Sequence, residues 1–246
     1  MSFRYVWFDL GYTLIRMQRE LTYGKVLRES GHDIPAETLG ETFHVVDKYF
    51  MREYPGVFGN FVYSPMPWYL GVVNYRLGVK ADLCALAARW MQVQRETRPY
   101  WVPFAETRPV LEELRRRRLG VGLISNWDHT SRRILDRLEL SRYLDPIVVS
   151  FDVGCAKPAA EIFRVAVERT GVPGEQCLYV GDNYYDDAVG ARKVGMQPLI
   201  VNRYGRLGIE EIRDCEVIHD LREVLRYLDP PGAVETGNGR TPPERS

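Results

Sequence analysis

The chain has 246 residues, 45% of them hydrophobic, and its 33 basic and 33 acidic residues give a net charge of zero. This length fits one or two domains with a sizeable buried core. The charge balance argues against binding a nucleic acid or a membrane surface through bulk electrostatics. The 4 cysteines form no CxxC pair, and no apolar run suits a secretory signal or a membrane span. We therefore expect a cytoplasmic protein with reduced thiols.

An apolar run at residues 5–8 leads into Asp9, which glycine and threonine soon follow. We predict a buried strand with its turn over residues 3–14. On its own, an aspartate at the end of a strand is more often a turn residue than a nucleophile. In an open parallel sheet, however, ligands bind at the carboxyl ends of the strands, so Asp9 is placed where chemistry can occur.

The next eighty residues or so are rich in aromatic side chains and lack a strong strand pattern. Their periodicity is helical, and prolines and glycines interrupt the middle of the segment. We predict a helical domain, residues 16–99, inserted after the first strand, in which most aromatic residues form the core. The expected helices are 19–30, 36–52, 67–77 and 81–98.

Beyond residue 103 strands and helices alternate, which predicts a doubly wound parallel sheet of the α/β class. The core domain is then discontinuous, formed by residues 1–15 and 100–229. Residues 230–246 are rich in proline, glycine and charge, so we expect a disordered tail there. The expected strands are 121–124, 147–150, 177–180, 198–201 and 217–218, and the expected helices are 107–118, 130–140, 159–170, 186–194 and 220–228.

Polar groups follow three of the predicted strands, and they carry the predicted chemistry. Two acids, Asp9 and Asp182, end different strands and should meet at one edge of the sheet. Carboxylate and carbonyl oxygens are the ligands that Mg²⁺ prefers, so Asp9, Asp182 and the backbone carbonyl of Gly11 form a candidate metal site. A cation there would draw in a phosphate, which Asp9 could attack to form an aspartyl-phosphate.

Three further residues could bind or stabilise that phosphate. Ser125 and Asn126 end the second core strand and can donate hydrogen bonds to phosphate oxygens. Lys157 precedes a helix and would add positive charge beside the transferring group. We expect Thr13 to form a hydrogen bond within the first turn and hold Asp9 in place. Asp187 either orients Lys157 or the metal shell, or simply caps its helix.

Four segments, in this order, resemble the motifs of the haloacid dehalogenase-like (HAD) hydrolase superfamily: residues 8–14, 124–128, 157–163 and 180–191. The resemblance covers nearly the whole chain except the tail. It implies a Rossmann-like core with a helical cap between the first and second motifs. It also implies a nucleophile at Asp9, a phosphate-contacting Ser125, the family's lysine at Lys157, and a metal-binding acid at Asp182, with Mg²⁺ in the phosphatase members.

One position departs from the phosphatases of that superfamily. They carry a second aspartate two residues after the nucleophile, and here that position is Gly11. This aspartate protonates the leaving group and later activates water, which is worth about 10²–10⁴-fold in rate. The next position, usually glycine, is Tyr12. Substitute acids would be Tyr12, Asp128, His129 or a group from the helical insert, although each is more readily explained as structural.

We therefore expect a Mg²⁺-dependent phosphatase of a small phosphorylated metabolite, working as a monomer or a homodimer. A first alternative is a metal-independent 2-haloacid dehalogenase, because dehalogenases of the superfamily also lack the second aspartate. They generally lack an acid at the position of Asp182, which would repel an anionic substrate if nothing neutralised it. A second alternative is a catalytically weak protein that binds a ligand without turning it over.

Overall fold

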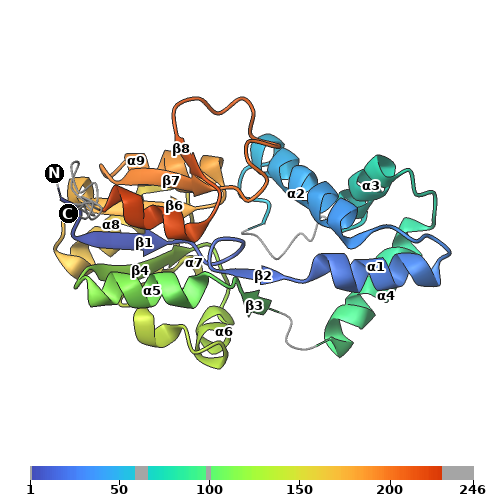
Figure 1. Cartoon of the computed structure of the whole chain (residues 1–246), viewed down its shortest axis with the longest axis horizontal. Helices are drawn as coiled ribbons and strands as arrows, with labels where there is room; N and C mark the ends of the chain where they lie inside the picture. The colour runs from blue at the N-terminus through green and yellow to red at the C-terminus, as the bar shows by residue number, and fades with distance from the viewer. Residues whose placement is uncertain (1, 59–65, 98–100, 229–246) are drawn as a thin grey trace, which may run out of the picture.

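The computed structural model describes residues 2–58, 66–97 and 101–228, so the tail expected at 230–246 lies outside the described residues. Figure 1 shows a sheet flanked by helices on one side of the molecule and a group of helices on the other, joined by a narrow ribbon. Among the described residues, no helix has the length and apolar character needed to cross a membrane.

The sheet has six strands, and every neighbouring pair is parallel. Their order is β5-β4-β1-β6-β7-β8, which places the first strand near the centre. This arrangement confirms the predicted doubly wound α/β fold. The strands are β1 (Tyr5–Phe8), β4 (Gly120–Ser125), β5 (Ile147–Val149), β6 (Cys177–Gly181), β7 (Gln197–Val201) and β8 (Glu216–Ile218).

The register of β1 fixes what lies next to Asp9. Phe8 pairs with Leu123 of β4 on one side and with Val180 of β6 on the other. The backbone N–H of Asp9 donates to the carbonyl of Val180 over 2.9 Å. Because the strands are parallel, the ends of β4 and β6 emerge beside Asp9 at the same edge of the sheet.

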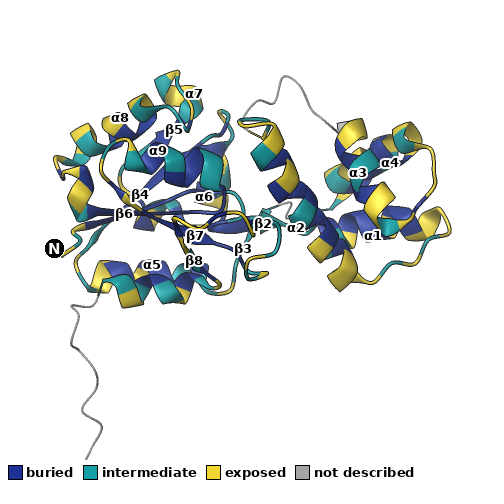
Figure 2. Ribbon diagram, turned by 90° about the horizontal axis from the view of Figure 1, so that it is seen from above, coloured by how far each residue is buried: buried dark blue, intermediate teal, exposed yellow. Residues whose placement is uncertain are grey.

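Side chains of β1 alternate between two buried layers, which explains why the strand is apolar throughout. Val6 and Phe8 lie in a cluster with α5 (Thr107–Arg116), whereas Tyr5 and Trp7 lie in a cluster with α8 (Ala160–Thr170). Figure 2 shows these two helices on opposite faces of the sheet. Further helical segments of the core are α6 (Ser131–Arg137), η1 (Ser141–Tyr143), α7 (Ser150–Val153), η2 (Gly174–Gln176), η3 (Tyr184–Ala188), α9 (Val189–Arg192) and η4 (Leu221–Tyr227).

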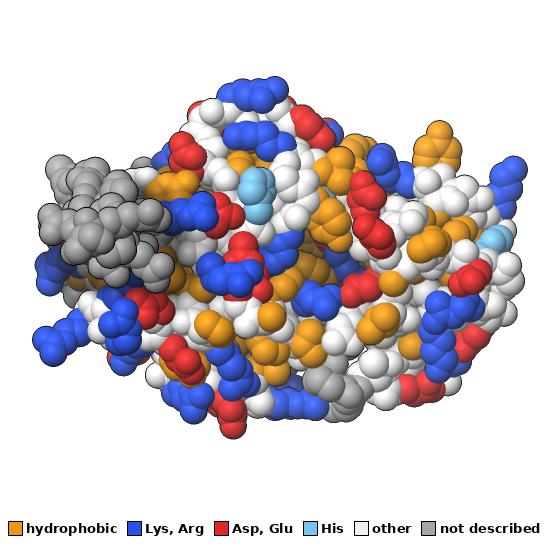
Figure 3. Space-filling view, viewed as in Figure 1, with side chains coloured by type: hydrophobic (Ala, Val, Ile, Leu, Met, Phe, Trp, Pro, Cys, Tyr) orange, Lys and Arg blue, Asp and Glu red, His pale blue; other side chains and the backbone are white. Residues whose placement is uncertain are grey.

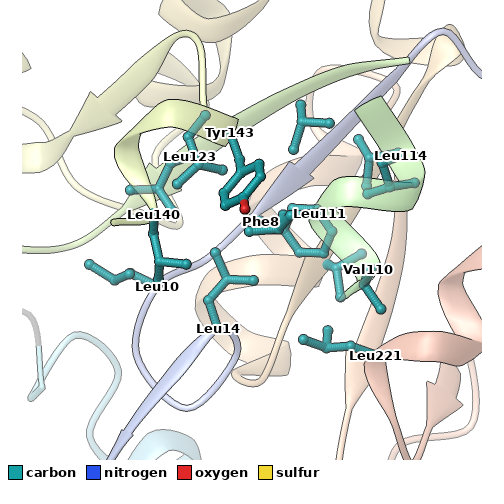
Figure 4. Close-up of a cluster of buried hydrophobic side chains, with 14 of the residues drawn as sticks. Phe8, Leu10, Leu14, Val110, Leu111, Leu114, Leu123, Leu140, Tyr143 and Leu221 are labelled. Atoms are coloured by element: carbon teal, nitrogen blue, oxygen red, sulfur yellow. The ribbon is translucent and has the colours of Figure 1, made fainter. Parts of the chain in front are cut away.

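The loop after β1 is anchored by two buried leucines. Figure 4 shows Leu10 and Leu14 in the same cluster as Val110 and Leu111 of α5. The backbone N–H groups of Leu14 and Ile15 both donate to the carbonyl of Leu10, over 3.0 and 3.1 Å. This packing holds the turn that carries Asp9 in one position.

The helical insert has a hydrophobic core of its own, built largely on aromatic contacts. Ring centroids of Tyr23 and Trp90 lie 5.0 Å apart, and those of Phe43 and Trp90 lie 5.7 Å apart. Such pairs contribute beyond the area they bury. The expectation that most of the aromatic residues of the insert pack in its core was wrong, because only half of the ten described ones are buried. The buried ones are Tyr23, Phe43, Phe50, Tyr69 and Trp90, and the exposed ones are Tyr49, Tyr54, Phe58, Trp68 and Tyr75. The helices of the insert, in the part that the structure describes, are α1 (Arg19–Glu29), α2 (Ala36–Glu53), α3 (Met66–Leu77) and α4 (Leu83–Glu96).

Several local expectations were wrong. The first strand and its turn lie within the expected residues 3–14, but the chain then forms an unexpected strand, β2 (Ile15–Met17), which pairs antiparallel with β3 (Trp101–Pro103). This ribbon connects the insert to the core, and its three-residue strands are too short to give a period. The last helix, expected at 220–228, is a 3₁₀ segment, η4. The helix expected from 186 begins earlier, as the π-helix η3.

The insert meets the core along one face of α2. His44 lies 3.0 Å from the carbonyl of Leu207 through its Nε2 atom, and Arg52 forms an ion pair with Glu211 at 3.5 Å. Lys48 lies midway between them, and the spacing of four residues puts all three on the same side of the helix. Figure 3 shows basic and acidic side chains interspersed over both parts of the molecule, as the zero net charge leads one to expect.

Candidate active site

Asp9 is buried, with 7% of its surface exposed, and two side chains orient its carboxylate. Ser125 donates from its hydroxyl to Oδ1 over 3.0 Å, and the Lys157 ammonium donates to the same oxygen over 2.6 Å. Neither of these bonds engages Oδ2. The carboxylate is therefore held by one oxygen in a way that suits attack by the other.

Lys157 is fixed from several directions. Its ammonium also donates to Asp187 Oδ1 over 2.6 Å and to the Tyr179 hydroxyl over 3.1 Å. The side-chain amide of Asn126 forms two hydrogen bonds with the backbone of Lys157. It accepts from the N–H over 2.7 Å and donates to the carbonyl over 2.9 Å. A buried ammonium between two carboxylates is a strong ion pair when its hydrogen bonds are satisfied, as they are here.

Asp187 reaches Lys157 because of the π-helix η3. The extra residue in this turn leaves Asp186 on a different side and aims Asp187 at the lysine. The backbone N–H of Asn183 donates to Asp187 Oδ2 over 2.9 Å. Gly181 is required beneath it, since a Cβ at that position would collide with the Asp187 carboxylate. Of the two placements considered for Asp187, the structure has the one beside Lys157.

A cation that was not expected from the sequence, Lys48, binds Asp182, the second acid of the candidate metal site. Lys48 of the insert places its ammonium 2.9 Å from Asp182 Oδ2 and also donates to the main-chain carbonyl of Asp182. The lysine side chain is 4% exposed. The one available signal was the four-residue spacing of His44, Lys48 and Arg52 in the predicted helix 36–52, which marks a polar stripe but not its partner.

Gly11 and Tyr12, the two unusual residues of the first motif, each have a structural reason. A Cβ at Gly11 would come within 3.2 Å of the indole of Trp127, so the ring occupies the space that a longer side chain would need. Tyr12 has a φ of 55°, a left-handed conformation that usually favours glycine. Its ring lies under the guanidinium of Arg19, 4.6 Å from the centroid, which helps to offset that cost.

The remaining candidates lie as follows. Thr13 is buried, but its hydroxyl has no hydrogen-bond partner among the described residues, so the bond expected within the turn was wrong. Asp128 accepts from the N–H of Thr130 over 2.9 Å, as a helix-start residue does, and His129 is exposed. The substrate-binding roles of Thr13, Gly11 and Asn126 stay predictions, although the Asn126 amide is already engaged by Lys157.

Burial and crowding of acids shift the pKa values at this edge. Burial raises the pKa of Asp9 to about 6 against the opposing effect of Lys157, and the charges of Asp187 and Asp182 add to the rise. Burial also raises the pKa of Asp182, with Lys48 acting in the opposite direction. The pKa of Asp186 rises to about 7 through burial and the charge of Asp187. These acids repel one another, which favours a bound cation.

This donor set fits a magnesium ion. Buried carboxylate oxygens are suitable ligands, and Oδ1 of Asp186 is buried without a hydrogen-bond partner in the described part of the chain. No group of three or more His, Cys, Asp or Glu side chains among the described residues is arranged to hold a metal by itself. Mg²⁺ often takes only one or two carboxylates, completing its shell with water and substrate phosphate.

The buried Asp186 carboxyl predicts a pH-dependent stability. Its folded pKa of about 7 exceeds its ordinary value of 3.8, so the stability it contributes at low pH is lost as the pH rises from about 4 to 7. Asp186→Asn removes this titration. We therefore expect the free energy of unfolding of the variant to rise by on the order of 2 kcal/mol relative to that of wild type as the pH increases from 5 to 8. Urea unfolding of both proteins in EDTA measures the difference, and equal pH slopes would contradict it.

A cavity of about 520 Å³ lies between the insert and the core. Phe43 and Lys48 come from the insert, whereas Phe104, Asp182 and Arg203 come from the core. This size suits a small metabolite. Asp9 is not among its described lining residues, although Asp182 and Tyr12 from the same edge of the sheet are.

The parallel sheet, with one oriented carboxylate at the carboxyl ends of its central strands, defines an α/β protein with a candidate catalytic acid where ligands bind. The model of the haloacid dehalogenase-like hydrolase family matches residues 13–195, and the chain belongs to this family.

Individual relatives agree with this assignment. Haloacid dehalogenase-like hydrolase domain-containing protein 3 of Xenopus laevis is 28% identical over 208 residues, covering 82% of this chain and 85% of that protein. A glyceraldehyde 3-phosphate phosphatase of Methanothermobacter thermautotrophicus is 33% identical over 106 residues, 41% of this chain and 45% of its own. The magnesium-bound structure of the HAD-hydrolase YfnB of Bacillus subtilis has a TM-score of 0.64 at 17% identity, covering 94% of this chain and 100% of its own, and it shows the shared fold.

Proposed function

We propose that this hydrolase is a Mg²⁺-dependent phosphatase of a small phosphorylated metabolite, acting through an aspartyl-phosphate on Asp9. The observation that carries the proposal is the Asp9 carboxylate, which Ser125 and Lys157 bind through Oδ1 only. The crowded acids at the same edge and the phosphatase among the relatives support it further. When bound by Asp9, Asp182 and the Gly11 carbonyl, Mg²⁺ would neutralise charge on the phosphate.

The chain's own residues perform the two steps. Oδ2 of Asp9 forms a bond to phosphorus while the bond from phosphorus to the leaving oxygen breaks, and that oxygen takes up a proton from water. Water then attacks phosphorus, the Asp9–phosphorus bond breaks, and inorganic phosphate leaves. Lys157 stabilises negative charge on the phosphoryl oxygens in both steps. Ser125 orients Asp9 through the hydrogen bond that it donates to Oδ1.

The absence of an acid at Gly11 has a consequence for the substrate. An alcohol of high pKa leaves slowly without a proton donor, whereas a phenol or an acid leaves readily as an anion. We therefore expect turnover to favour phosphate esters and anhydrides with good leaving groups.

A panel of phosphate monoesters with leaving groups of graded pKa tests the proposal. We expect phosphate release that stops in EDTA, returns with added Mg²⁺, and falls steeply as the pKa of the leaving group rises. The panel includes 2-chloropropionate, from which we expect no chloride. Phosphate release that is indifferent to EDTA would contradict the metal-dependent mechanism.

A metal-independent 2-haloacid dehalogenase is the second candidate, and the Lys48–Asp182 ion pair is the observation that favours it. An unneutralised Asp182 would repel the anionic haloacid, and Lys48 neutralises that acid. In this reaction Oδ2 of Asp9 displaces halide from the carbon next to the carboxylate, and water then hydrolyses the ester on Asp9. Chloride release in EDTA from the same panel would support this candidate over the phosphatase.

A further inference from the structure

The Lys48 ammonium lies against an acidic position at the boundary between insert and core. Two oxygens of Asp182 accept from it, the carboxylate Oδ2 at 2.9 Å and the main-chain carbonyl, and the sulfur of Met51 lies 3.7 Å away. The lysine side chain is 4% exposed and the Asp182 side chain 11%. A buried ammonium that donates to both of these oxygens provides the positive charge that a metal ion would otherwise supply to Asp182.

This pair is also the strongest polar contact described along the face of α2 that meets the core. The Arg52–Glu211 pair in the same stripe is 37% and 41% exposed, so solvent screens it and it contributes little. His44 contacts the backbone carbonyl of Leu207 and the ring of Tyr204, neither of which is charged. Breaking the Lys48–Asp182 bond therefore removes the main polar attachment of α2 to the sheet edge.

We propose that Lys48 and Mg²⁺ bind Asp182 in alternation, so that metal loading releases α2 from the core. The inference rests on the proposed function for the metal site at Asp182. Both cations require the same carboxylate, and a divalent ion next to an ammonium in a buried site is strongly repelled. Because coupling between two binding events is reciprocal, Lys48 weakens metal binding by the same factor by which the metal weakens the Lys48 contact.

The cavity between insert and core explains what the release accomplishes. Lys48 and Asp182 both line it, whereas Asp9 is not among its described lining residues. The ion pair therefore forms part of the wall of the cavity in which a substrate would bind. Exchange of the ammonium for a metal ion opens this boundary at the moment when the site becomes competent to hold a phosphate.

The first test measures the accessibility of Lys48 in the wild-type protein. Amine acetylation followed by mass spectrometry is carried out with and without Mg²⁺, and Lys25 and Lys80, two exposed lysines of the insert, serve as internal controls. We expect Mg²⁺ to raise the labelling rate of Lys48 at least about fivefold and to leave the controls unchanged. Equal labelling of Lys48 in both conditions, at a Mg²⁺ concentration that saturates the site, would overturn the inference.

The second test measures Mg²⁺ affinity by calorimetry. Lys48→Met removes the competing ammonium, and we expect Mg²⁺ to bind at least about fivefold more tightly than in wild type, with Lys25→Met unchanged. Equal or weaker Mg²⁺ binding by a folded Lys48→Met protein would overturn the inference. The proposed function would still hold in that case if the wild type showed Mg²⁺-dependent phosphatase activity. If no protein binds Mg²⁺, both proposals fail. Should Lys48→Met not fold, labelling of the wild type decides.

Discussion

Asp9→Asn should lower turnover roughly 10⁴-fold or more while the protein remains folded, because it removes the attacking oxygen and leaves the rest of the site in place. The amide keeps the shape of the carboxylate but is a very poor nucleophile. Lys157 retains Asp187 as its partner in this variant, so the site does not lose its buried charge pair. Steady-state phosphate release on the best substrate of the panel measures the loss.

Two controls separate the nucleophile from a general effect. Asp33→Asn makes the same chemical change at an exposed position of the insert and should have wild-type activity. Acid quenching during turnover should trap a phosphoryl group on the peptide that contains Asp9 in the wild type and none in the variant. Asp9→Ala guards against slow deamidation of the introduced asparagine back to the acid. A phosphoryl group trapped on another residue, or full activity in Asp9→Ala, would show that Asp9 is not the nucleophile.

The residues at the sheet edge could be predicted because strand topology places them. Asp9, Ser125 and Asp182 each follow an apolar run, and parallel strands bring their ends together whatever the exact register. Lys157 ends no strand, and its place ahead of a predicted helix and the family resemblance together assigned it to this edge. The contact between Lys48 and Asp182 could not be predicted from the sequence, because these residues are 134 positions apart and their contact depends on how a short ribbon orients the insert.

Side-chain volume and helix phase account for the other differences. Sequence alone presents Gly11 as a missing acid, whereas the structure places the Trp127 indole over it, a contact between motifs that spacing does not encode. The sequence left open whether Asp187 orients Lys157 or caps its helix, and the π-turn, which shifts the helix by one residue, places its carboxylate beside Lys157.

Lys157→Met should abolish activity and also destabilise the fold by about 3–5 kcal/mol at pH 8. The ammonium is the shared partner of Asp9 and Asp187, with 2.6 Å to each, and its side chain is 4% exposed. Without it, two buried carboxylates face each other unpaired. Urea unfolding in EDTA gives the free energy, and Lys25→Met, at an exposed lysine, is the matched control and should be neutral.

The loss should depend on pH in a definite direction. Lys157 holds the pKa of Asp9 down, so its removal raises that pKa above about 6 in the folded state, while the unfolded value is unchanged. A raised folded pKa contributes stability at low pH that is lost as the pH rises. The stability of the variant should therefore be closer to that of wild type at pH 5 than at pH 8.

Lys157→Arg restores the charge and should recover much of the stability. It should not recover the activity, because the wider guanidinium does not fit between the two acids as the compact ammonium does. A Lys157→Met protein as stable as wild type at pH 8 would mean that the two acids do not depend on the lysine for their burial.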